Sequence, residues 1–542
     1  MGWNLAEAKS ERSRKKQLGQ FLTPPELAEQ IVASTSLGSS ARVLEPSFGD
    51  GSFLIPLIRH LMESRQGSPK IRFNQVMTEQ LWGVEIDPDL YHRAITQIEG
   101  EFGRLPSGHH LVCGDFFTTE YMSHFFDVVI GNPPFGGTFN PDIEDLLDRR
   151  YGKWKQYKLK KETYSFFIAR SLDLMAPEGR LLFISSDTFL TINTMKGLRA
   201  KLMDLCQVEV STLDGFSDET SHPMLVLRAT LDGRSSAVVV NNKKIGREAI
   251  EATGNLSWGI SDDLIQYFTG SIIGDKLVAT SGMTVGRNEL FVRDIFNDEI
   301  EEPYEFECFD DPITLRREIE RARLNRLSPG MVERVRQLEA AGVTRRNVRV
   351  VPRKNGALRV RLPNPAYRFY NKADSGIVYA KPKSAIFWQD GGDAVLTFKK
   401  NGNWYLHGVG GQPYFEREGL TWQLISPRIN MRYLPPGQIL DSGAPCLFLR
   451  EGVSRDELWI VLGWSLTNRA TEIMKTVINH TRNIQGKDME RLPYPFWLDE
   501  ERRRQVIALV SDMVSDAESG RVFRRTDSVF QDLEELFRFG LF

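Results

Sequence analysis

The sequence predicts an α/β fold in the first half of the chain and a mixed α+β fold in the second half. The chain has 542 residues, which is enough for two or three domains. Before about Lys243, short apolar segments alternate with segments of helical period, as expected for a parallel sheet. After Lys243 the predicted strands are short and punctuated by glycine. We therefore predict domains at residues 1–245 and 246–498 and a helical segment at residues 499–542.

Each of four predicted strands in the first half ends in a turn that carries polar or glycine residues. The carboxyl ends of parallel strands meet at one edge of an open α/β sheet, where ligands bind. We therefore predict that these turns form a ligand site. The strand-end sequences are Glu45-Pro46-Ser47-Phe48-Gly49-Asp50-Gly51, Glu85-Ile86-Asp87-Pro88, Asp115-Phe116-Phe117 and Gly131-Asn132-Pro133-Pro134-Phe135.

The turn at Asn132 carries groups that suit one kind of reaction. Pro133 restricts Asn132 to extended geometry, so the turn is stiff. The Asn132 side-chain oxygen and the Pro133 carbonyl can accept hydrogen bonds from the two N–H groups of an amine on a planar heterocycle. Two such acceptors free the delocalised lone pair of the amine for attack, and Phe135 can stack on the ring. The alternative is a proline-rich turn with no chemical role.

Composition excludes several classes of protein. The net charge is −2, so a nucleic-acid partner is indicated only by local basic segments. The four cysteines are far apart and form no Cys-x-x-Cys pair, so we expect no metal site and no disulfide framework. We also expect no signal peptide, no membrane span and a cytoplasmic protein.

Asn132-Pro133-Pro134-Phe135 resembles the catalytic motif of S-adenosylmethionine-dependent amino-methyltransferases. The companion motifs resemble those of the γ-class N6-adenine DNA methyltransferases of restriction-modification systems, in which the cofactor motifs come first and a target-recognition domain follows. This resemblance implies a Rossmann-like S-adenosylmethionine-dependent methyltransferase domain at residues 1–245 and a target-recognition domain at residues 246–498. It also implies double-stranded DNA as substrate, with the adenine flipped out of the duplex.

The resemblance assigns cofactor-binding roles along the first domain. The segment around Phe21 and Thr23 is implied to hold the methionine carboxylate, although Thr23 also has the spacing of a helix N-cap with Glu26 as its capping-box partner. The other implied cofactor contacts are Glu45, Pro46, Ser47, Gly49 and Gly51 at the methionine part, Glu85 at the ribose, Asp115, Phe116 and Phe167 at the adenine, and Ile86 next to Glu85. Phe167 could equally be an ordinary core aromatic.

A basic run and one aromatic residue are the predicted substrate contacts in the first domain. Residues 149–161 contain seven basic residues and no acid. We predict a loop here that contacts DNA phosphates through Arg149, Lys153 and Lys155; a solvated charged face is the alternative. The resemblance implies that Phe216 stacks on the flipped base from the side opposite Phe135.

A second basic stretch lies in the second half of the chain. Residues 316–372 contain 16 Lys or Arg and four acids. Arginine can bind phosphates and guanine edges with two hydrogen bonds, so we predict DNA contacts from Arg345, Arg346 and Arg349. A solvated helix followed by a basic hairpin is the alternative.

The sequence therefore predicts a site-specific methyltransferase that acts on adenine N6 in DNA. One alternative is a ribosomal-RNA guanine or protein-glutamine methyltransferase that shares the Asn-Pro-Pro-aromatic motif. The other is a DNA-specificity subunit with an inactive methyltransferase fold. We find no separate nuclease block and expect no DNA cleavage, so a separate cognate restriction endonuclease is the candidate partner. The sequence leaves open whether the protein is a monomer or a homodimer.

Overall fold

The structure is a computed structural model of the whole chain. It describes residues 22–136, 139, 141–213, 224–254, 257–310, 346–396, 399–400, 403–404 and 409–540. The chain divides into two compact units, Met1–Gln266 and Tyr267–Phe542, which we call unit 1 and unit 2.

Unit 1 is built on a nine-stranded mixed sheet with the order β11-β10-β8-β9-β7-β4-β1-β2-β3. Strands β3, β2, β1, β4 and β7 are parallel neighbours, whereas β9 lies antiparallel between β7 and β8. The strands are β1 Val43–Glu45, β2 Leu81–Glu85, β3 His110–Cys113, β4 Phe126–Gly131, β7 Met175–Ser186, β8 Cys206–Leu213, β9 Met224–Leu231, β10 Ala237–Val240 and β11 Lys243–Gly246.

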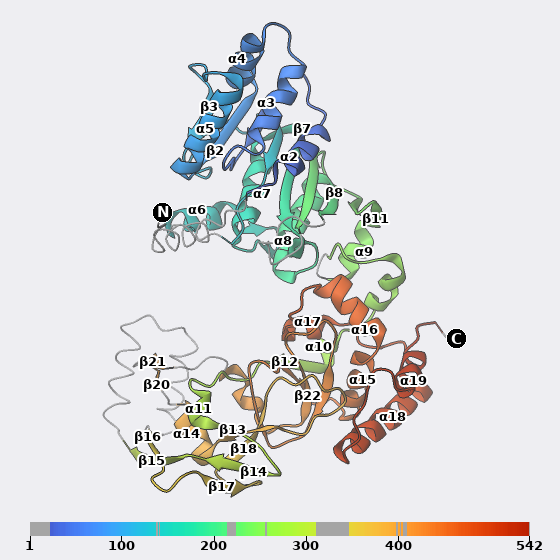
Figure 1. Cartoon of the computed structure of the whole chain (residues 1–542). Coiled ribbons are helices and arrows are strands. Elements are labelled where there is room, and N and C mark those ends of the chain that lie inside the picture. Colours follow the sequence, from blue (N-terminus) through green and yellow to red (C-terminus); the bar gives the residue numbers. More distant parts are fainter. Residues whose placement is uncertain are drawn as a thin grey trace. The chain divides into compact units, whose positions relative to one another are not determined.

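Helices pack against this sheet (Figure 1). Apolar residues of α2, α3, α4 and α5 form one core with strand residues such as Val43, Val128 and Ile184. The α7 helix is buried along almost its whole length. The helices of unit 1 are α2 Pro25–Ala33, α3 Leu54–Glu63, α4 Pro69–Glu79, α5 Pro88–Phe102, α6 Pro141–Tyr151, α7 Thr163–Leu174, α8 Lys196–Leu205 and α9 Arg247–Ala252, with a short hairpin of β5 Lys153–Trp154 and β6 Tyr157–Lys158 between α6 and α7.

Unit 1 ends later in the chain than residue 245. The Trp258 side chain is fully buried, and its indole N–H donates to the Met203 sulfur at 3.2 Å. The Trp258 ring also meets the Phe189 ring edge-on at 5.0 Å. These contacts attach the segment after α9 to α8 and its neighbours, and the division between the units falls after Gln266.

Unit 2 combines small sheets with helices. Two four-stranded sheets have the orders β12-β25-β22-β23 and β13-β19-β18-β24. Their strands are β12 Leu277–Thr280, β25 Cys446–Leu449, β22 Gly419–Trp422, β23 Met431–Leu434, β13 Val292–Asp294, β19 Ser384–Phe387, β18 Tyr367–Asn371 and β24 Gln438–Leu440. Two-stranded ladders are formed by β14 Glu299–Glu302 with β17 Leu358–Arg361, β15 Tyr304–Asp310 with β16 Arg346–Pro352, and β20 Lys399–Lys400 with β21 Asn403–Trp404.

The helices of unit 2 lie mostly after these strands in the chain. The α15 helix is buried from Glu457 to Ser465, and α18 packs against it, so the C-terminal helices belong to unit 2. The helices are α10 Ile273–Lys276, α11 Asn288–Phe291, α14 Asp393–Leu396, α15 Asp456–Ser465, α16 Asn468–Ile473, α17 Gly486–Arg491, α18 Glu500–Glu518 and α19 Val529–Leu536. None of the helices in the described part of the chain has the length and apolar character that crossing a membrane requires.

Candidate functional site

The predicted strand-end motifs lie together at one edge of the unit 1 sheet. β1 is paired in parallel with β4 on one side and β2 on the other, and β2 is paired in parallel with β3. The turns after these four strands therefore line the same carboxyl edge. In unit 1 this edge holds the glycine loop, Glu85, Asp115 and the Asn132 turn.

Glu85 holds the glycine loop against the end of β2. One of its carboxylate oxygens accepts a hydrogen bond from the Gly49 amide at 2.8 Å, and the other accepts from the Asp87 amide at 2.8 Å. Gly49 and Gly51 have φ values of 57° and 98°, which favour glycine. Burial raises the pKa of Glu85, although the two amide hydrogen bonds oppose the shift.

Glu45 is a second buried carboxyl group at this edge. Its side chain is 1% exposed and lies against Gly131, where a Cβ atom would be 3.4 Å from Glu45 Cγ. Burial raises the pKa of Glu45 well above its ordinary value, and the charges of Glu85 and Asp50 raise it further. Among the described residues, no hydrogen-bond partner reaches its buried Oε2 atom. The site therefore offers a carboxyl group suited to a ligand that brings a positive charge or a hydrogen-bond donor.

The Asn132 turn is held by two residues from elsewhere in unit 1. The Asn132 side-chain N–H donates to the Thr23 hydroxyl at 3.2 Å, and the Ser47 hydroxyl donates to the Asn132 carbonyl at 3.3 Å. This orientation of the amide directs its oxygen away from Thr23. Phe135 packs against the apolar core, with its ring centroid 5.7 Å from that of Tyr164.

The predicted N-cap role of Thr23 is wrong. The α2 helix begins at Pro25, its N-cap is Pro24, and no side chain caps it. Pro24 already has extended geometry and Pro25 suits the first helical position, so the helix begins one residue later than the capping-box spacing predicts. Thr23 is instead buried, with its hydroxyl on Asn132.

The predicted adenine-side residues form an aromatic cluster after β3. The Phe116 and Phe167 rings are stacked with centroids 4.9 Å apart, and both side chains are buried. The Asp115 carboxylate accepts from the Phe117 amide at 2.8 Å, which fixes the turn. Ile86, at the end of β2, is 49% exposed and leaves apolar surface at the same edge.

Arg170 supports this turn and was not predicted from the sequence. Its guanidinium donates to the carbonyl oxygens of Phe117 at 2.8 Å and Thr119 at 2.6 Å, and it lies 5.1 Å from the Phe116 ring centroid. Burial lowers the pKa of Arg170. The sequence does contain a sign of this role, which is a single arginine within the apolar segment of α7. A buried arginine at such a position needs hydrogen-bond acceptors.

The basic run after the Asn132 turn is ordered as α6 and the β5–β6 hairpin, so the prediction of a loop is wrong. Two buried side chains of α6, Leu147 and Tyr151, anchor this helix. Lys155 pairs with Asp204 at 2.6 Å, and Lys161 pairs with Glu144 at 2.9 Å. Arg149 and Lys153 are exposed. Contacts of this segment with DNA stay a prediction.

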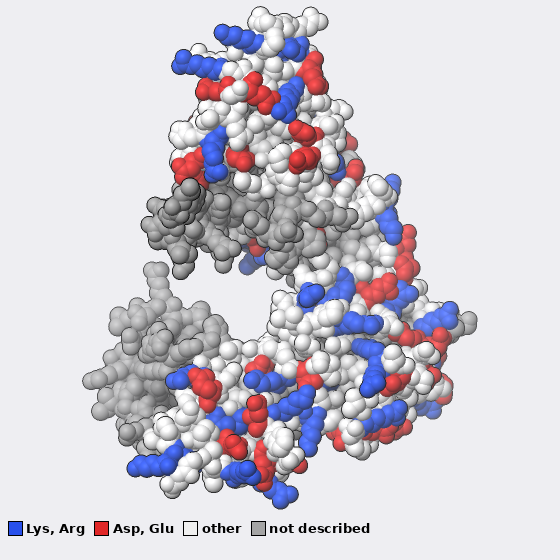
Figure 2. All heavy atoms as spheres, viewed as in Figure 1, with Lys and Arg blue, Asp and Glu red and all other residues white. Residues whose placement is uncertain are grey.

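The arginine-rich strands of unit 2 are paired with acidic strands rather than with each other. In the β15–β16 register, Arg346 stands opposite Asp310 and Arg349 opposite Glu307. In β14–β17, the Arg359 guanidinium lies 3.9 Å from the Glu301 carboxylate. Figure 2 shows acidic and basic groups interspersed over the described surface of unit 2 that faces the viewer.

Several predicted site residues lie outside what the structure describes. Phe21, Phe216 and Arg345 are not among the described residues, and the side chains of Arg346 and Arg349 are also outside them. Within the described part of the chain, no group of three or more His, Cys, Asp or Glu residues could hold a metal ion.

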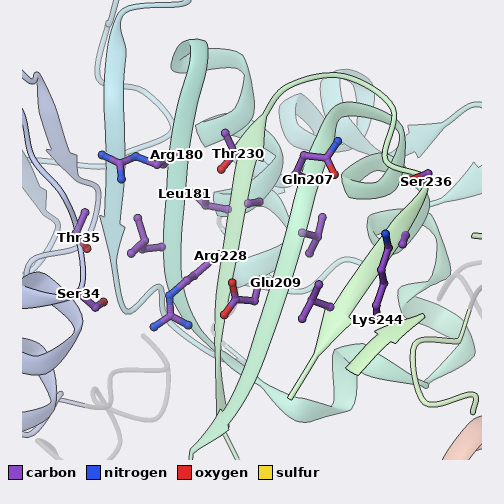
Figure 3. A pocket seen from close by; sticks show the side chains of 15 residues that line it. Ser34, Thr35, Arg180, Leu181, Gln207, Glu209, Arg228, Thr230, Ser236 and Lys244 are labelled. Carbon is purple, nitrogen blue, oxygen red and sulfur yellow. The ribbon is translucent and has the colours of Figure 1, made fainter. Parts of the chain in front are cut away.

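A separate pocket lies away from this edge. It has a volume of about 460 Å³ and is lined by residues from the middle of β7, the beginning of β8 and the end of β9 (Figure 3). Arg180, Glu209, Arg228 and Lys244 are among its lining residues. The lining includes none of the predicted site residues.

The sheet order and the strand-end motifs define the class of unit 1 as a Rossmann-like methyltransferase fold. A solved structure, the DrdV–DNA complex, supports this fold with a TM-score of 0.56 and 14% identity over 93% of this chain and 58% of that chain.

Comparison with known sequences finds similarity to restriction-modification methylases. The family model for the Eco57I restriction-modification methylase matches residues 109–215. The type II methyltransferase M.HincII of Haemophilus influenzae is 28% identical over 196 residues, which are 36% of this chain and 33% of that protein. M.BstVI of Geobacillus stearothermophilus is 28% identical over 247 residues, which are 41% of this chain and 43% of that protein. The resemblance predicted from the motifs is confirmed, and the matched stretch spans less than half the length of these relatives.

The buried Glu45 carboxyl group makes a testable contribution to stability. Its raised pKa means that the folded state holds a proton that the unfolded chain has released, so stability is lost as the pH rises from about 4.5 through the folded-state pKa. At a pH above both pKa values, each tenfold difference in proton affinity between the two states costs about 1.4 kcal/mol. We expect Glu45→Gln to raise the melting temperature of the ligand-free protein at pH 8 more than at pH 5. Thermal unfolding followed by circular dichroism measures this.

Glu451→Gln is the control, because the Glu451 side chain is exposed and forms no ion pair among the described residues. This variant should follow the wild-type melting curve at both pH values. Equal changes in melting temperature for Glu45→Gln at pH 5 and pH 8 would contradict the electrostatic account of Glu45.

Proposed function

We propose that the protein is a site-specific DNA methyltransferase that transfers a methyl group from S-adenosylmethionine to N6 of a flipped adenine in double-stranded DNA. The observation that carries the proposal is the shared carboxyl edge of β4, β1, β2 and β3. It brings the Asn132 turn next to the glycine loop and Glu85. The match of residues 109–215 to a restriction-modification methylase supports the same function.

The Asn132 turn supplies the acceptors for the substrate amine. The Asn132 side-chain oxygen and the Pro133 carbonyl would accept hydrogen bonds from the two N6 hydrogens. These hydrogen bonds favour a tetrahedral nitrogen over the planar, delocalised one, so they stabilise the transition state more than the bound substrate. Phe135 would hold one face of the adenine, and Phe216 is proposed for the other face. No covalent bond between protein and base is needed, so catalysis is mostly positioning.

The residues at the other three strand ends fit the cofactor. S-adenosylmethionine supplies a methyl group on a positively charged sulfonium. The buried Glu45 carboxyl group, whose Oε2 atom has no hydrogen-bond partner among the described residues, suits a ligand with positive charge. We assign Glu85 to the ribose hydroxyls, since a carboxylate oxygen has two lone pairs and can accept a hydroxyl beside the backbone amides of Gly49 and Asp87. Asp115, Phe116 and Ile86 are assigned to the adenine of the cofactor.

Methyl transfer from tritiated S-adenosylmethionine tests the proposal. Sheared genomic DNA of high sequence complexity, ribosomal RNA and total protein serve as parallel acceptors. We expect label on DNA. Asn132→Ala should lower it by about 100-fold or more, because the lost acceptor stabilises the transition state more than the bound substrate. Cofactor affinity should change little, because Asn132 is assigned to the substrate amine. The exposed Gln66→Ala variant is the control.

Each alternative function predicts a different result in this assay. Label on RNA or protein alone would replace the proposal with a ribosomal-RNA or protein methyltransferase. Sequence-specific DNA binding without transfer would favour a non-catalytic specificity subunit.

Thr23 is predicted to orient the catalytic amide. Thr23→Val keeps the shape of the side chain and removes the hydroxyl that accepts from Asn132. For Thr23→Val we expect kcat at saturating cofactor to fall about 10-fold, because one hydrogen bond of roughly 1.4 kcal/mol is lost. Thr23→Ser keeps the hydroxyl and should keep the wild-type kcat. If the valine and serine variants had the same kcat, the hydrogen bond to Asn132 would have no role in catalysis.

We propose that the arginine-rich stretch of unit 2 contacts the DNA backbone. Replacing Arg345, Arg346 and Arg349 with glutamine should reduce the salt dependence of DNA binding by about one unit of log–log slope for each phosphate lost. Fluorescence anisotropy with duplex DNA measures the slope, and Arg504→Gln on α18 is the control, since that side chain is 74% exposed. An unchanged slope would mean that these arginines do not contact phosphates.

A further inference from the structure

The β5–β6 hairpin has two chemically different faces. Its register pairs Lys153 with Lys158 and Trp154 with Tyr157, and Lys155 has a φ of 51° in the turn between the strands. Side chains alternate between the two faces of a strand, and directly opposite residues share a face. Trp154 and Tyr157 therefore lie on one face, and Lys153 and Lys158 lie on the other.

The aromatic face is clamped to α8. The Lys201 ammonium lies 5.3 Å from the Trp154 ring centroid, and the Lys196 ammonium lies 5.4 Å from that of Tyr157. At Gly197 a Cβ atom would stand 2.3 Å from the Lys158 carbonyl oxygen, so only glycine lets the backbone of β6 approach the helix this closely. The hairpin thus has one fixed orientation on α8.

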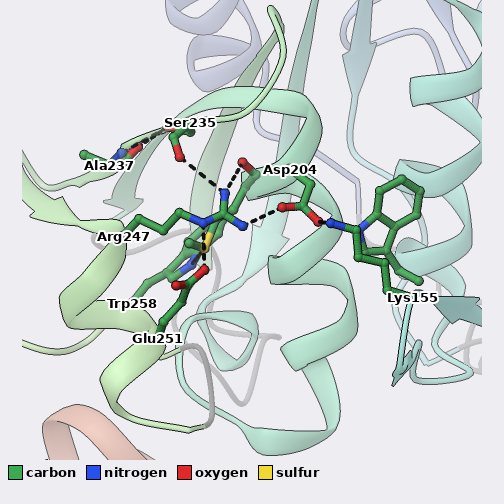
Figure 4. Close-up of polar contacts among 9 residues, drawn as sticks. Lys155, Asp204, Ser235, Ala237, Arg247, Glu251 and Trp258 are labelled. Atoms are coloured by element: carbon green, nitrogen blue, oxygen red, sulfur yellow. Dashed lines mark hydrogen bonds and ion pairs between the residues drawn. The ribbon is translucent and has the colours of Figure 1, made fainter.

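Asp204 at the end of α8 fixes the tip of the hairpin (Figure 4). One carboxylate oxygen accepts from the Trp154 indole N–H at 2.9 Å and pairs with the Lys155 ammonium at 2.6 Å. The other oxygen accepts from Arg247, which also pairs with Glu251 at 2.7 Å. Burial opposes ionisation, but the hydrogen bonds from Lys155, Trp154 and Arg247 lower the pKa of Asp204 to about 2. The carboxylate therefore stays charged at neutral pH.

Among the described residues, the lysine face has no such partners. Lys153 and Lys158 are exposed, and no carboxylate in the described part of the chain forms an ion pair with either. Lys160 and Lys161, in the same basic run, pair with Glu162 and Glu144 at 2.5 and 2.9 Å. Like charges directly opposite each other destabilise a two-stranded ladder. An anion held between the two ammonium groups would relieve this repulsion.

The hairpin is part of the chain segment that connects β4 to β7. The hairpin follows the carboxyl end of β4 and precedes α7, which leads back to the beginning of β7. Since β4 and β7 are parallel neighbours, the crossover between them starts at the carboxyl edge. The hairpin therefore belongs to the crossover that begins at the Asn132 turn.

We infer that Lys153 and Lys158 together bind one backbone phosphate of the nucleic-acid substrate, and that Asp204 is the residue that positions them. The inference rests on the proposed function. Lysine binds phosphate as a point charge, and two rigidly held ammonium groups on one face form a site for a single phosphodiester. Lys155 is then a structural tie to Asp204 rather than a phosphate ligand.

Salt-dependent binding of the full-length protein to a 30-base-pair labelled duplex tests the site. The Lys153→Gln/Lys158→Gln variant should lower the log–log salt slope by about one unit, the value for one phosphate. Either single variant should cause most of this change, because the two lysines share that phosphate. The control Lys160→Gln/Lys161→Gln removes the same charge from ion-paired lysines and should keep the wild-type slope. Equal slopes in the two double variants would overturn the site.

The role of Asp204 is tested by non-additivity. Asp204→Asn should reduce the salt slope as the lysine variant does, with cofactor affinity by calorimetry unchanged. Added to Lys153→Gln/Lys158→Gln, it should reduce the slope no further. Additive losses, or a loss of cofactor affinity, would overturn the positioning role. If wild-type protein methylated DNA while the lysine variants kept its slope, only this inference would fail; wild-type protein that neither bound nor methylated DNA would remove the proposed function as well.

Discussion

The parallel pairing of β1 with β4 and β2 is the constraint from which the geometry of the site follows. It brings Glu45 against Gly131, Ser47 onto the Asn132 carbonyl, and the glycine loop onto Glu85. A slip of one residue in either register would turn the strand-end side chains to the other face of the sheet. The buried apolar residues of β1 and β4 prevent such a slip, so the packing of the core also fixes the chemistry of the edge.

Two buried carboxyl groups make this edge costly in the absence of a ligand. Glu45 and Glu85 both have raised pKa values because of burial, and the charge of Glu85 further raises the pKa of Glu45. The fold tolerates this cost because the amides of Gly49 and Asp87 hold Glu85 in place. A site where burial disfavours ionisation of a carboxyl group is prepared for a positively charged ligand, because such a ligand favours the ionised form. A more stable arrangement would bind such a ligand less well.

Much of unit 1 could be predicted from the sequence, because its strands are short apolar runs that end in distinctive turns. The Asn132, Glu85 and Asp115 turns all lie at the predicted edge. The role of Thr23 could not be predicted, since two prolines shift the start of α2 and the partner of Thr23 lies 109 residues away in the sequence. Arg170 was missed for the same reason, because its acceptors belong to a different segment, the turn after β3. Charge patterns were the least informative, because a count of basic residues cannot show which acids will face them after folding. Lys155 forms an ion pair with Asp204, which is far away in the sequence. Lys153, two residues earlier, is not part of this ion pair.

The proposed chemistry requires that two oxygens at the Asn132 turn activate an amine attached to a planar base. Mass spectrometry of nucleosides released from DNA treated with the protein and S-adenosylmethionine identifies the atom that receives the methyl group. We predict N6-methyldeoxyadenosine as the product. Methyl groups on a ring carbon or ring nitrogen of any base would contradict this chemistry, because those positions carry no amine for the two acceptors to hold.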